Sequence, residues 1–281
     1  MRIQLGWFDE RLVDRIAAIA AGRLVPAVPR DAATVMVLRP APDQPADAVE
    51  VLMLRRPAAM AFAPGAYVFP GGSVDAADGD TGIGWSGPDP AEFGERLGCS
   101  AAAARALVCA AIRETFEESG VLLAGRPDGS PVAPGPSLED DRAALAAGSV
   151  TFAELLARRG LVLLAGLLIP WARWITPEAE PRRFDARFFA AALPPGQRAV
   201  GHHAEADRTV WLRPAAAVEA ARAGSMVMLP PTATTLHEFA ALGGAAAILG
   251  SRRTIAPVMP RLAAEDGEAW LFIPDEADYP L

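Results

Sequence analysis

Three glutamates stand close together in residues 113–121, which read RETFEESGV. Glu114, Glu117 and Glu118 have the spacing i, i+3 and i+4, so a helix would carry their carboxylates on one face. Like charges at this spacing destabilise a helix by about 0.2–0.5 kcal/mol per pair, unless the face binds a cation. Mg²⁺ prefers carboxylate and phosphate oxygens. These residues therefore predict a site where a dication activates water and neutralises a phosphorylated substrate.

The alternative for these glutamates is a solvated acidic turn, which is the usual meaning of clustered charge. Two features of the surrounding sequence favour chemistry instead. Residues 101–111 are almost all small or apolar, so the charge is concentrated at one end of the expected helix, and a Phe-Pro-Gly-Gly turn at residues 69–72 precedes that helix. Arg113 lies four residues before Glu117 and can brace it. The opposite face, which would pack on a sheet, carries Cys109, Ile112 and Phe116.

The helix that carries the glutamates is predicted over residues 101–119, between a Ser100 N-cap and Gly120. Strands are expected at 33–38 and 49–54, joined as a hairpin, and at 66–69, 161–171 and 209–212. Further helices are expected at 8–21, 138–147, 152–159, 214–223 and 233–242. Residues 75–98 are rich in Gly, Asp and Pro and look like an inserted loop. Strands mixed with helices, without a repeat or a long linker, predict a single α/β (α+β) domain over residues 1–281.

The charge balance excludes several classes of partner. The 281-residue chain has a formal net charge of −8 and contains no lysine, so all 26 basic residues are arginines. An acidic chain has no broad electrostatic surface for nucleic acid or anionic lipid, and a chain without lysine excludes Schiff-base and P-loop chemistry. The longest apolar run, residues 161–169, is shorter than the roughly 20 residues that a membrane helix needs. We therefore expect a cytoplasmic protein with no nucleic-acid partner and no membrane partner.

Residues 113–121 resemble the second half of the Nudix box, the signature of the Nudix hydrolase family. In that box, the first half consists of Gly, five residues, Glu and seven residues, and the second half reads Arg-Glu-apolar-x-Glu-Glu-x-Gly-apolar. Thr115 stands where the family usually has an aliphatic residue. The first half is split here, because Gly72 and Asp78 resemble its glycine and its acid, yet 34 residues separate Asp78 from Arg113. Counting back along the helix instead puts Arg105 at the position of the acid.

A finer resemblance connects the chain with the Nudix branch that cleaves coenzyme A (CoA) and acyl-CoA, of the peroxisomal type with an insertion inside the box. It rests on residues 54–56, 60–72, 75 and 78, and downstream on 171–177, 181–189, 211–214 and 229–232. The resemblance implies a Nudix fold, a mixed β-sheet sandwiched between helices, with inserted loops and a helical C-terminal extension. We expect the core at about 30–225, the insertion at about 75–98 and the extension at about 226–281.

The resemblance also implies a reaction, the hydrolysis of the CoA diphosphate with Mg²⁺ or Mn²⁺ to give 3′,5′-ADP and 4′-phosphopantetheine or its acyl form. Glu114, Glu117, Glu118 and the Gly72 carbonyl would bind the metal, and Arg113 would orient a glutamate. Glu117 or Glu118 would act as the general base, with Glu205 as an outside candidate. The implied partner is a small-molecule diphosphate, and a homodimer is left open.

Outside the box, the candidate substrate-binding residues are Arg55, Arg56, Phe62 and Phe69. Arginine forks suit phosphate, although strand alternation would point the two arginines to opposite faces. Either phenylalanine could stack on adenine, line the pantetheine path or pack in the core. The arginines of residues 182–187 could surround a 3′-phosphate or form surface ion pairs with Asp185. Trp171 and Trp174 are expected in the core.

Two other functions stay open from the sequence. Another Nudix diphosphatase, acting on NADH, ADP-ribose or a nucleotide sugar, would carry the same box, because substrate choice lies outside it. A non-catalytic Nudix module that senses a nucleotide would be favoured by loss of a glutamate from the triad, and all three glutamates are present.

Overall fold

The centre of the protein is a mixed β-sheet, seen in a computed structural model that describes residues 2–4, 10–42, 44–45, 47–58, 63–132, 135–200, 208–265, 268–274 and 277–281. Within these residues the sheet has eight strands in the order β11-β3-β2-β10-β9-β12, with β4 paired to β3 and β5 paired to β2. They are β2 (Arg30–Pro40), β3 (Val49–Arg55), β4 (Tyr67–Val68), β5 (Gly71–Ser73), β9 (Ile169–Ile175), β10 (Phe184–Ala192), β11 (Arg208–Leu212) and β12 (Pro257–Val258). Because β2 pairs in parallel with β10 and antiparallel with β3, the predicted hairpin and the mixed sheet are both confirmed.

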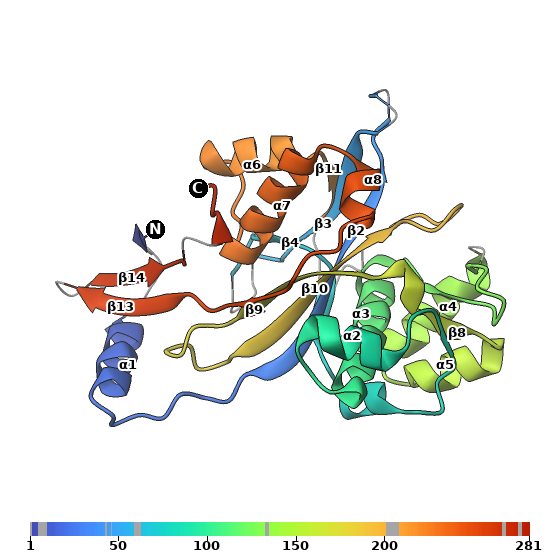
Figure 1. Cartoon of the computed structure of the whole chain (residues 1–281), viewed down its shortest axis with the longest axis horizontal. Helices are drawn as coiled ribbons and strands as arrows, with labels where there is room; N and C mark the ends of the chain where they lie inside the picture. Colours follow the sequence, from blue (N-terminus) through green and yellow to red (C-terminus); the bar gives the residue numbers. More distant parts are fainter. Residues whose placement is uncertain are drawn as a thin grey trace.

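Helices cover both faces of this sheet (Figure 1). One side carries α2 (Pro90–Leu97), α3 (Ala101–Ser119), α4 (Pro136–Ala146) and α5 (Phe152–Arg159), and the other carries α6 (Pro214–Arg222), α7 (Pro230–Leu242) and α8 (Ala245–Leu249). Strand β2 shows how one sheet serves two cores. Side chains of a strand alternate between faces, so Val35 and Val37 pack in the hydrophobic cluster with α3, whereas Met36 and Leu38 pack in the cluster with α7. The predicted sandwich is confirmed.

Helix α3 has the boundaries that the sequence predicts. The Ser100 hydroxyl accepts a hydrogen bond from the Ala103 amide at 3.2 Å, which satisfies one of the free amides of the first turn. Gly120 ends the helix in the left-handed conformation at φ 72°, a conformation that costs a glycine little. Ile112 and Phe116 are fully buried toward the sheet. The three glutamates of this helix therefore sit on a rigid, well-packed element.

The segment expected as an inserted loop is largely ordered secondary structure, which corrects that expectation. It contains the 3₁₀ helix η1 (Ala76–Gly79), strand β6 (Trp85–Ser86) and α2. The start of α2 has a capping box, in which Asp89 and Glu92 satisfy each other's backbone amides, and Pro90 occupies the first turn. Strand β6 pairs in parallel with β8 (Val162–Leu164), which also pairs with β7 (Ala124–Gly125). The insertion is thereby joined to the rest of the fold at several points.

A second correction concerns the apolar run 161–171, which is two strands rather than one. Strands β8 and β9 are separated by the 3₁₀ helix η2 (Ala165–Leu167). At this break the backbone of Gly166 lies so close to Gly87 that a Cβ on Gly87 would be 2.4 Å from the Gly166 nitrogen. The turn at η2 thus depends on the insertion, which periodicity alone does not reveal.

The C-terminal extension begins with helices, as predicted, and its later part forms strands that were not predicted. After α7 and α8 it continues into β12 and then into β13 (Arg261–Glu265) and β14 (Glu268–Phe272), which form a small sheet with β1 (Arg2–Gln4) in the order β1-β14-β13. Helix α1 (Glu10–Ala20) packs on that sheet through Leu12 and Ile16, which share a hydrophobic cluster with Leu262 and Leu271. Among the described helices, none has the length and apolarity needed to cross a membrane. The single domain stays a prediction.

Candidate active site

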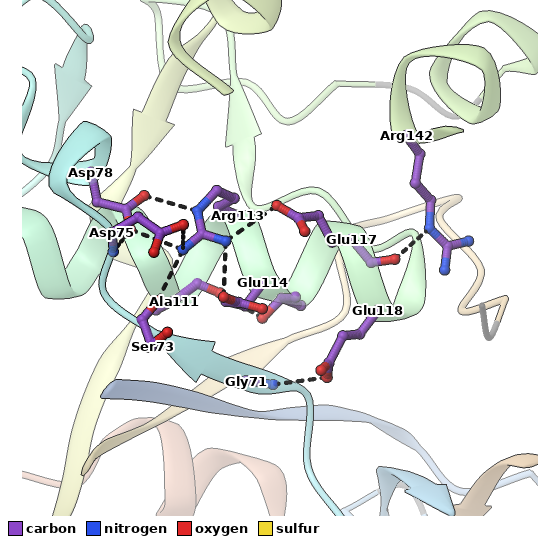
Figure 2. A network of polar contacts seen from close by, with 11 residues as sticks. Gly71, Ser73, Asp75, Asp78, Ala111, Arg113, Glu114, Glu117, Glu118 and Arg142 are labelled. Atoms are coloured by element: carbon purple, nitrogen blue, oxygen red, sulfur yellow. Dashed lines mark hydrogen bonds and ion pairs between the residues drawn. The ribbon is translucent and has the colours of Figure 1, made fainter. Parts of the chain in front are cut away.

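The site is organised around the buried guanidinium of Arg113 (Figure 2). Its Nε and Nη2 atoms donate to the two carboxylate oxygens of Asp78 at 2.9 Å each, and Nη2 also donates to the Ser73 carbonyl at 3.1 Å. Asp78 is only 2% exposed and accepts a further hydrogen bond from the Asp75 amide at 2.8 Å. This fork favours Asp78 over Arg105 as the acid of the split Nudix box, because the insertion folds back and returns Asp78 to the helix.

The remaining edge of the Arg113 guanidinium holds two of the predicted metal ligands. Nη1 donates to Glu114 Oε1 at 2.8 Å and to Glu117 Oε1 at 3.2 Å. Burial alone would lower the pKa of Arg113, but its hydrogen bonds to Asp78 and the charges of Glu114, Asp78 and Glu117 outweigh burial and raise it. Arg113 is thus a permanent cation in contact with Glu114 and Glu117. That it orients a glutamate for the reaction stays a prediction.

The third glutamate is oriented by the turn that precedes β5. The Gly71 amide donates to Glu118 Oε2 at 2.9 Å, and β5 is held in place by pairing of Gly71 and Gly72 with Thr34 and Ala33 of β2. The absence of a side chain at Gly72 matters for Glu114, since a Cβ there would lie 2.4 Å from both Cδ and Oε1 of that carboxylate. The glycine turn and the helix therefore approach each other at the glutamates (Figure 2).

The residues where the glycine turn meets α3 carry the type of oxygen donor that a hard dication prefers. Three carboxylates and a backbone carbonyl are the oxygen donors that Mg²⁺ and Mn²⁺ take, and the space that a Cβ at Gly72 would fill is occupied by the Glu114 carboxylate itself. In the part of the chain that the structure describes, no three acidic, histidine or cysteine side chains converge tightly enough to form a metal group. To share one ion, Glu114, Glu117 and Glu118 would have to turn from Arg113 and Gly71. The metal-ligand assignment stays a prediction.

A residue that the sequence analysis missed holds the end of α3. Arg142 of α4 is 4% exposed, and its Nε donates to the Glu117 carbonyl at 2.9 Å. A guanidinium at the C-terminal end of a helix also interacts favourably with the helix dipole. The neighbouring Gly120 leaves room for it, because a Cβ on Gly120 would lie 3.2 Å from Arg142 Nη1. Nothing local in the sequence indicates this contact, which spans 25 residues.

A cavity of about 250 Å³ lies beside this network. It is lined by residues of the insertion, by the flank of α3 that carries Cys109, Arg113 and Glu117, and by the segment between α4 and α5. Its polar wall includes Asp78, Arg113 and Glu117, and its apolar wall includes Leu145 and Phe152. Ligand pockets usually measure about 300–1,000 Å³, so this cavity is the size of a fragment of a ligand.

The other candidate residues are spread over several places. Arg55 ends β3, where it pairs with Tyr67 of β4 and with Arg208 of β11. Arg56 follows it, and both side chains are half-buried. Phe69 is 4% exposed and packs in the core, so the structure favours its packing role over a ligand contact. Phe62 and Glu205 lie outside the described residues.

The arginines of residues 182–187 do not act together. Arg187 is 3% exposed and pairs with Asp31 at 2.8 Å and Asp185 at 2.9 Å, whereas Arg183 donates to the carbonyls of Thr176 and Ala27. Among the described contacts, the expected ion pair with Asp185 is present for Arg187, whose side chain is buried rather than on the surface. Trp171 and Trp174 are buried as predicted.

Comparison with known proteins shows related sequences and structures. Residues 90–239 match the NUDT19 Nudix domain. The acyl-coenzyme A diphosphatase NUDT19 of chicken (Gallus gallus) is 31% identical over 252 residues, which covers 72% of this chain and 65% of the relative, and that of Homo sapiens is 30% identical over 229 residues, covering 68% and 60%. The crystal structure of a NUDIX hydrolase from Alicyclobacillus acidocaldarius matches with a TM-score of 0.67 at 28% identity, covering 81% of this chain and 98% of the other. The chain spans roughly three fifths of the length of the curated relatives it matches.

Proposed function

The chain belongs to the Nudix hydrolase family, and from that premise we propose that it hydrolyses the diphosphate bond of CoA or acyl-CoA with the help of Mg²⁺ or Mn²⁺. Water would attack one phosphorus of the diphosphate, and the bridging P–O bond would break. The products would be 3′,5′-ADP and 4′-phosphopantetheine or its acyl form. The names of the chicken and human relatives support this choice of substrate.

The observation that carries the proposal is the gathering of Asp78, Glu114 and Glu117 around one guanidinium, next to Glu118 on the glycine turn. This many carboxylates would repel a diphosphate, so the substrate needs a dication between itself and the protein. Glu114, Glu117, Glu118 and the Gly72 carbonyl would hold that ion, which when bound would neutralise the diphosphate and lower the pKa of a water. Mg²⁺ and Mn²⁺ both take such oxygen donors.

The protein's own groups would then perform three tasks. Arg113, fixed by Asp78, keeps Glu114 and Glu117 in place before the substrate arrives. Glu117 or Glu118 would take the proton from the attacking water. Because the chain has no lysine, phosphate groups outside the metal site must be held by arginines or backbone amides, for which Arg55 and Arg56 are the proposed residues.

The proposal is tested by incubating the protein with Mg²⁺ or Mn²⁺ and a panel of CoA, acyl-CoA, NADH, ADP-ribose and a nucleotide sugar, and then identifying the products by mass. We expect 3′,5′-ADP from CoA and acyl-CoA, with the largest kcat/KM on one of these two. Turnover of NADH or ADP-ribose without 3′,5′-ADP from CoA would contradict the CoA assignment but keep a Nudix diphosphatase. Nucleotide binding without any turnover would favour a sensor.

A further inference from the structure

Arg105 joins the insertion to the helix of the Nudix box. It lies on α3, eight residues before Arg113, and therefore on nearly the same face of the helix. Its Nη2 donates to the carbonyl of Ile83 and, at 3.4 Å, to that of Thr81, and its Nε reaches the Asp80 carbonyl at 3.4 Å. The guanidinium also lies over the ring of Trp85, 5.3 Å from the centroid, where a cation is favourable.

These contacts fix the chain immediately after Asp78. The 3₁₀ helix η1 ends at Gly79, and the carbonyls that Arg105 contacts begin at Asp80. Asp78 itself is anchored by the Asp75 amide on its N-terminal side and by Arg113. Asp78 is thus held between two arginines of one helix, one that contacts its carboxylate and one that contacts the backbone following it.

We propose that Arg105 is a positioning residue for the metal site, because it holds the insertion so that Asp78 can neutralise and orient Arg113. This inference rests on the proposed metal-dependent function. In this arrangement Asp78 occupies the Nε and Nη2 edge of the Arg113 guanidinium and leaves Nη1 for Glu114 and Glu117. If Asp78 moves away, Arg113 loses its strongest partner and competes more strongly with a dication for these two glutamates.

The direction in which dication affinity changes distinguishes a positioning role of Arg105 from a purely electrostatic one. Removal of a cation from the neighbourhood of a metal site should strengthen dication binding if only electrostatics act. Loss of Arg105 is instead expected to weaken it, because the displaced Asp78 frees the Arg113 guanidinium. A role limited to folding would change the unfolding midpoint and leave the dication affinity of the folded protein unchanged.

The experiment measures Mn²⁺ binding to the full chain without substrate, by titration followed by electron paramagnetic resonance of the free ion, for R105M, D78N and the double variant. Residues that orient metal ligands typically contribute about 10–100-fold to affinity, so we expect D78N to raise the Kd of Mn²⁺ about tenfold and R105M by a smaller factor of about three to ten. The double variant should match D78N alone, because Arg105 acts through Asp78. R96M is the matched control, since it removes another arginine of the insertion region, on α2, and should leave the Kd unchanged.

Two results would overturn the proposal. One is an unchanged or lower Kd in R105M, and the other is a double variant whose effect equals the product of the single effects. If R105M does not fold, as judged by circular dichroism, the W85L variant removes the ring beneath the guanidinium instead and should raise the Kd in the same direction. Because the readout is Mn²⁺ binding, it holds whether or not CoA is the substrate; failure of wild-type protein to cleave CoA would count only against the proposed function.

Discussion

Two clusters of arginine and aspartate or glutamate side chains differ in their charge balance. The acidic cluster surrounds Arg113 and consists of Asp75, Asp78, Arg113, Glu114 and Glu117. The balanced cluster joins β2, β9 and β10 and consists of Asp31, Arg173, Asp185 and Arg187. Among these described contacts, one guanidinium meets four carboxylates in the first cluster, whereas two guanidinium groups meet two carboxylates in the second.

This difference separates the proposed metal site from an ion-pair cluster that joins strands. In the balanced cluster Asp185 accepts from Arg173 Nε and Nη2 at 2.9 and 2.7 Å, so the charges are neutralised within the protein. In the acidic cluster the fork between Asp78 and Arg113 is equally well formed, yet it leaves an excess of negative charge at Glu114 and Glu117. Charges that are partly removed from water need partners, and in the proposed function a dication would supply them in the acidic cluster.

The largest expected effect comes from E117Q. Metal-assisted stabilisation of a phosphoryl transition state contributes several kcal/mol, so loss of this carboxylate should lower kcat/KM roughly a thousandfold, equivalent to about 4 kcal/mol. The free energy of unfolding should not fall, because glutamine still accepts from Arg113 and relieves like-charge repulsion. Product formation at saturating Mg²⁺ and thermal unfolding of the same preparation measure the two quantities. Full turnover by E117Q would contradict the assignment of Glu117 to the metal site.

The opposite pattern is expected for D185N in the balanced cluster. Removing one partner of a buried ion pair costs about 3–5 kcal/mol; because Arg187 keeps Asp31, we expect the lower end, about 3 kcal/mol. The activity of the folded protein should be unchanged. Urea unfolding and kcat/KM measured on one sample check both parts. A variant that keeps its stability but loses turnover would show that the balanced cluster also serves the substrate.

Adjacent glycines provide a finer comparison within the acidic site. A Cβ at Gly72 would meet the Glu114 carboxylate at 2.4 Å, the movable end of a side chain, whereas a Cβ at Gly71 would meet the Ala33 carbonyl oxygen at 2.4 Å and the Thr34 Cα at 2.7 Å. We therefore expect G72A to raise the metal concentration needed for half-maximal activity about tenfold, with little loss in the free energy of unfolding. G71A should destabilise the protein by about 1–3 kcal/mol, because the β2 backbone cannot give way. Equal effects of both variants on stability would contradict this reading of the turn.

The local features of this site could be predicted from the sequence, and its long-range contacts could not. The boundaries of α3 and the shared face of its glutamates follow from helical period, an N-cap and a glycine, which all act within one element. The choice of Asp78 over Arg105 depends on the path of 34 intervening residues, and the Arg142 contact depends on how α4 packs. Neither leaves a periodic signal.

The errors in the fold have equally specific causes. The density of Gly, Asp and Pro in residues 75–98 suggested a loop, although Asp89, Pro90 and Glu92 form a capping box that starts α2. The uniform apolar character of residues 161–171 concealed the break at η2, which is set by the approach of Gly87. Phe69 stands beside a glycine turn, but the turn directs its side chain into the core. Tertiary packing overrode the local pattern at η2 and at Phe69, whereas the start of α2 has a local signal that the composition of the segment concealed.

The smallest expected effect uses the two cysteines as reporters, one beside each cluster. Burial raises the pKa of the Cys109 thiol, and the charge of Asp78 and a hydrogen bond with it raise the pKa further. Burial also raises the pKa of Cys99, but there the nearby charges have both signs: Arg187 and Arg173 lower it, while Asp31 and Asp185 raise it. The ultraviolet absorbance of the thiolate, recorded against pH in C99S and in C109A, should therefore show Cys109 ionising at the higher pH.

The same reporters give a pH dependence of stability with a definite sign. Near neutral pH both thiols are protonated in the folded and the unfolded chain, so their contribution is intact. As the pH rises past about 8.5, the ordinary pKa of a thiol, the unfolded chain ionises while folded Cys109 does not, and the free energy of unfolding must fall. C109A should flatten this alkaline decline in the free energy of unfolding more than C99S does. D78N should lower the pKa of Cys109 and leave that of Cys99 unchanged. If D78N leaves the pKa of Cys109 unchanged, the negative charge of the acidic cluster does not affect the ionisation of a thiol on α3. That result would contradict the contrast between the two clusters.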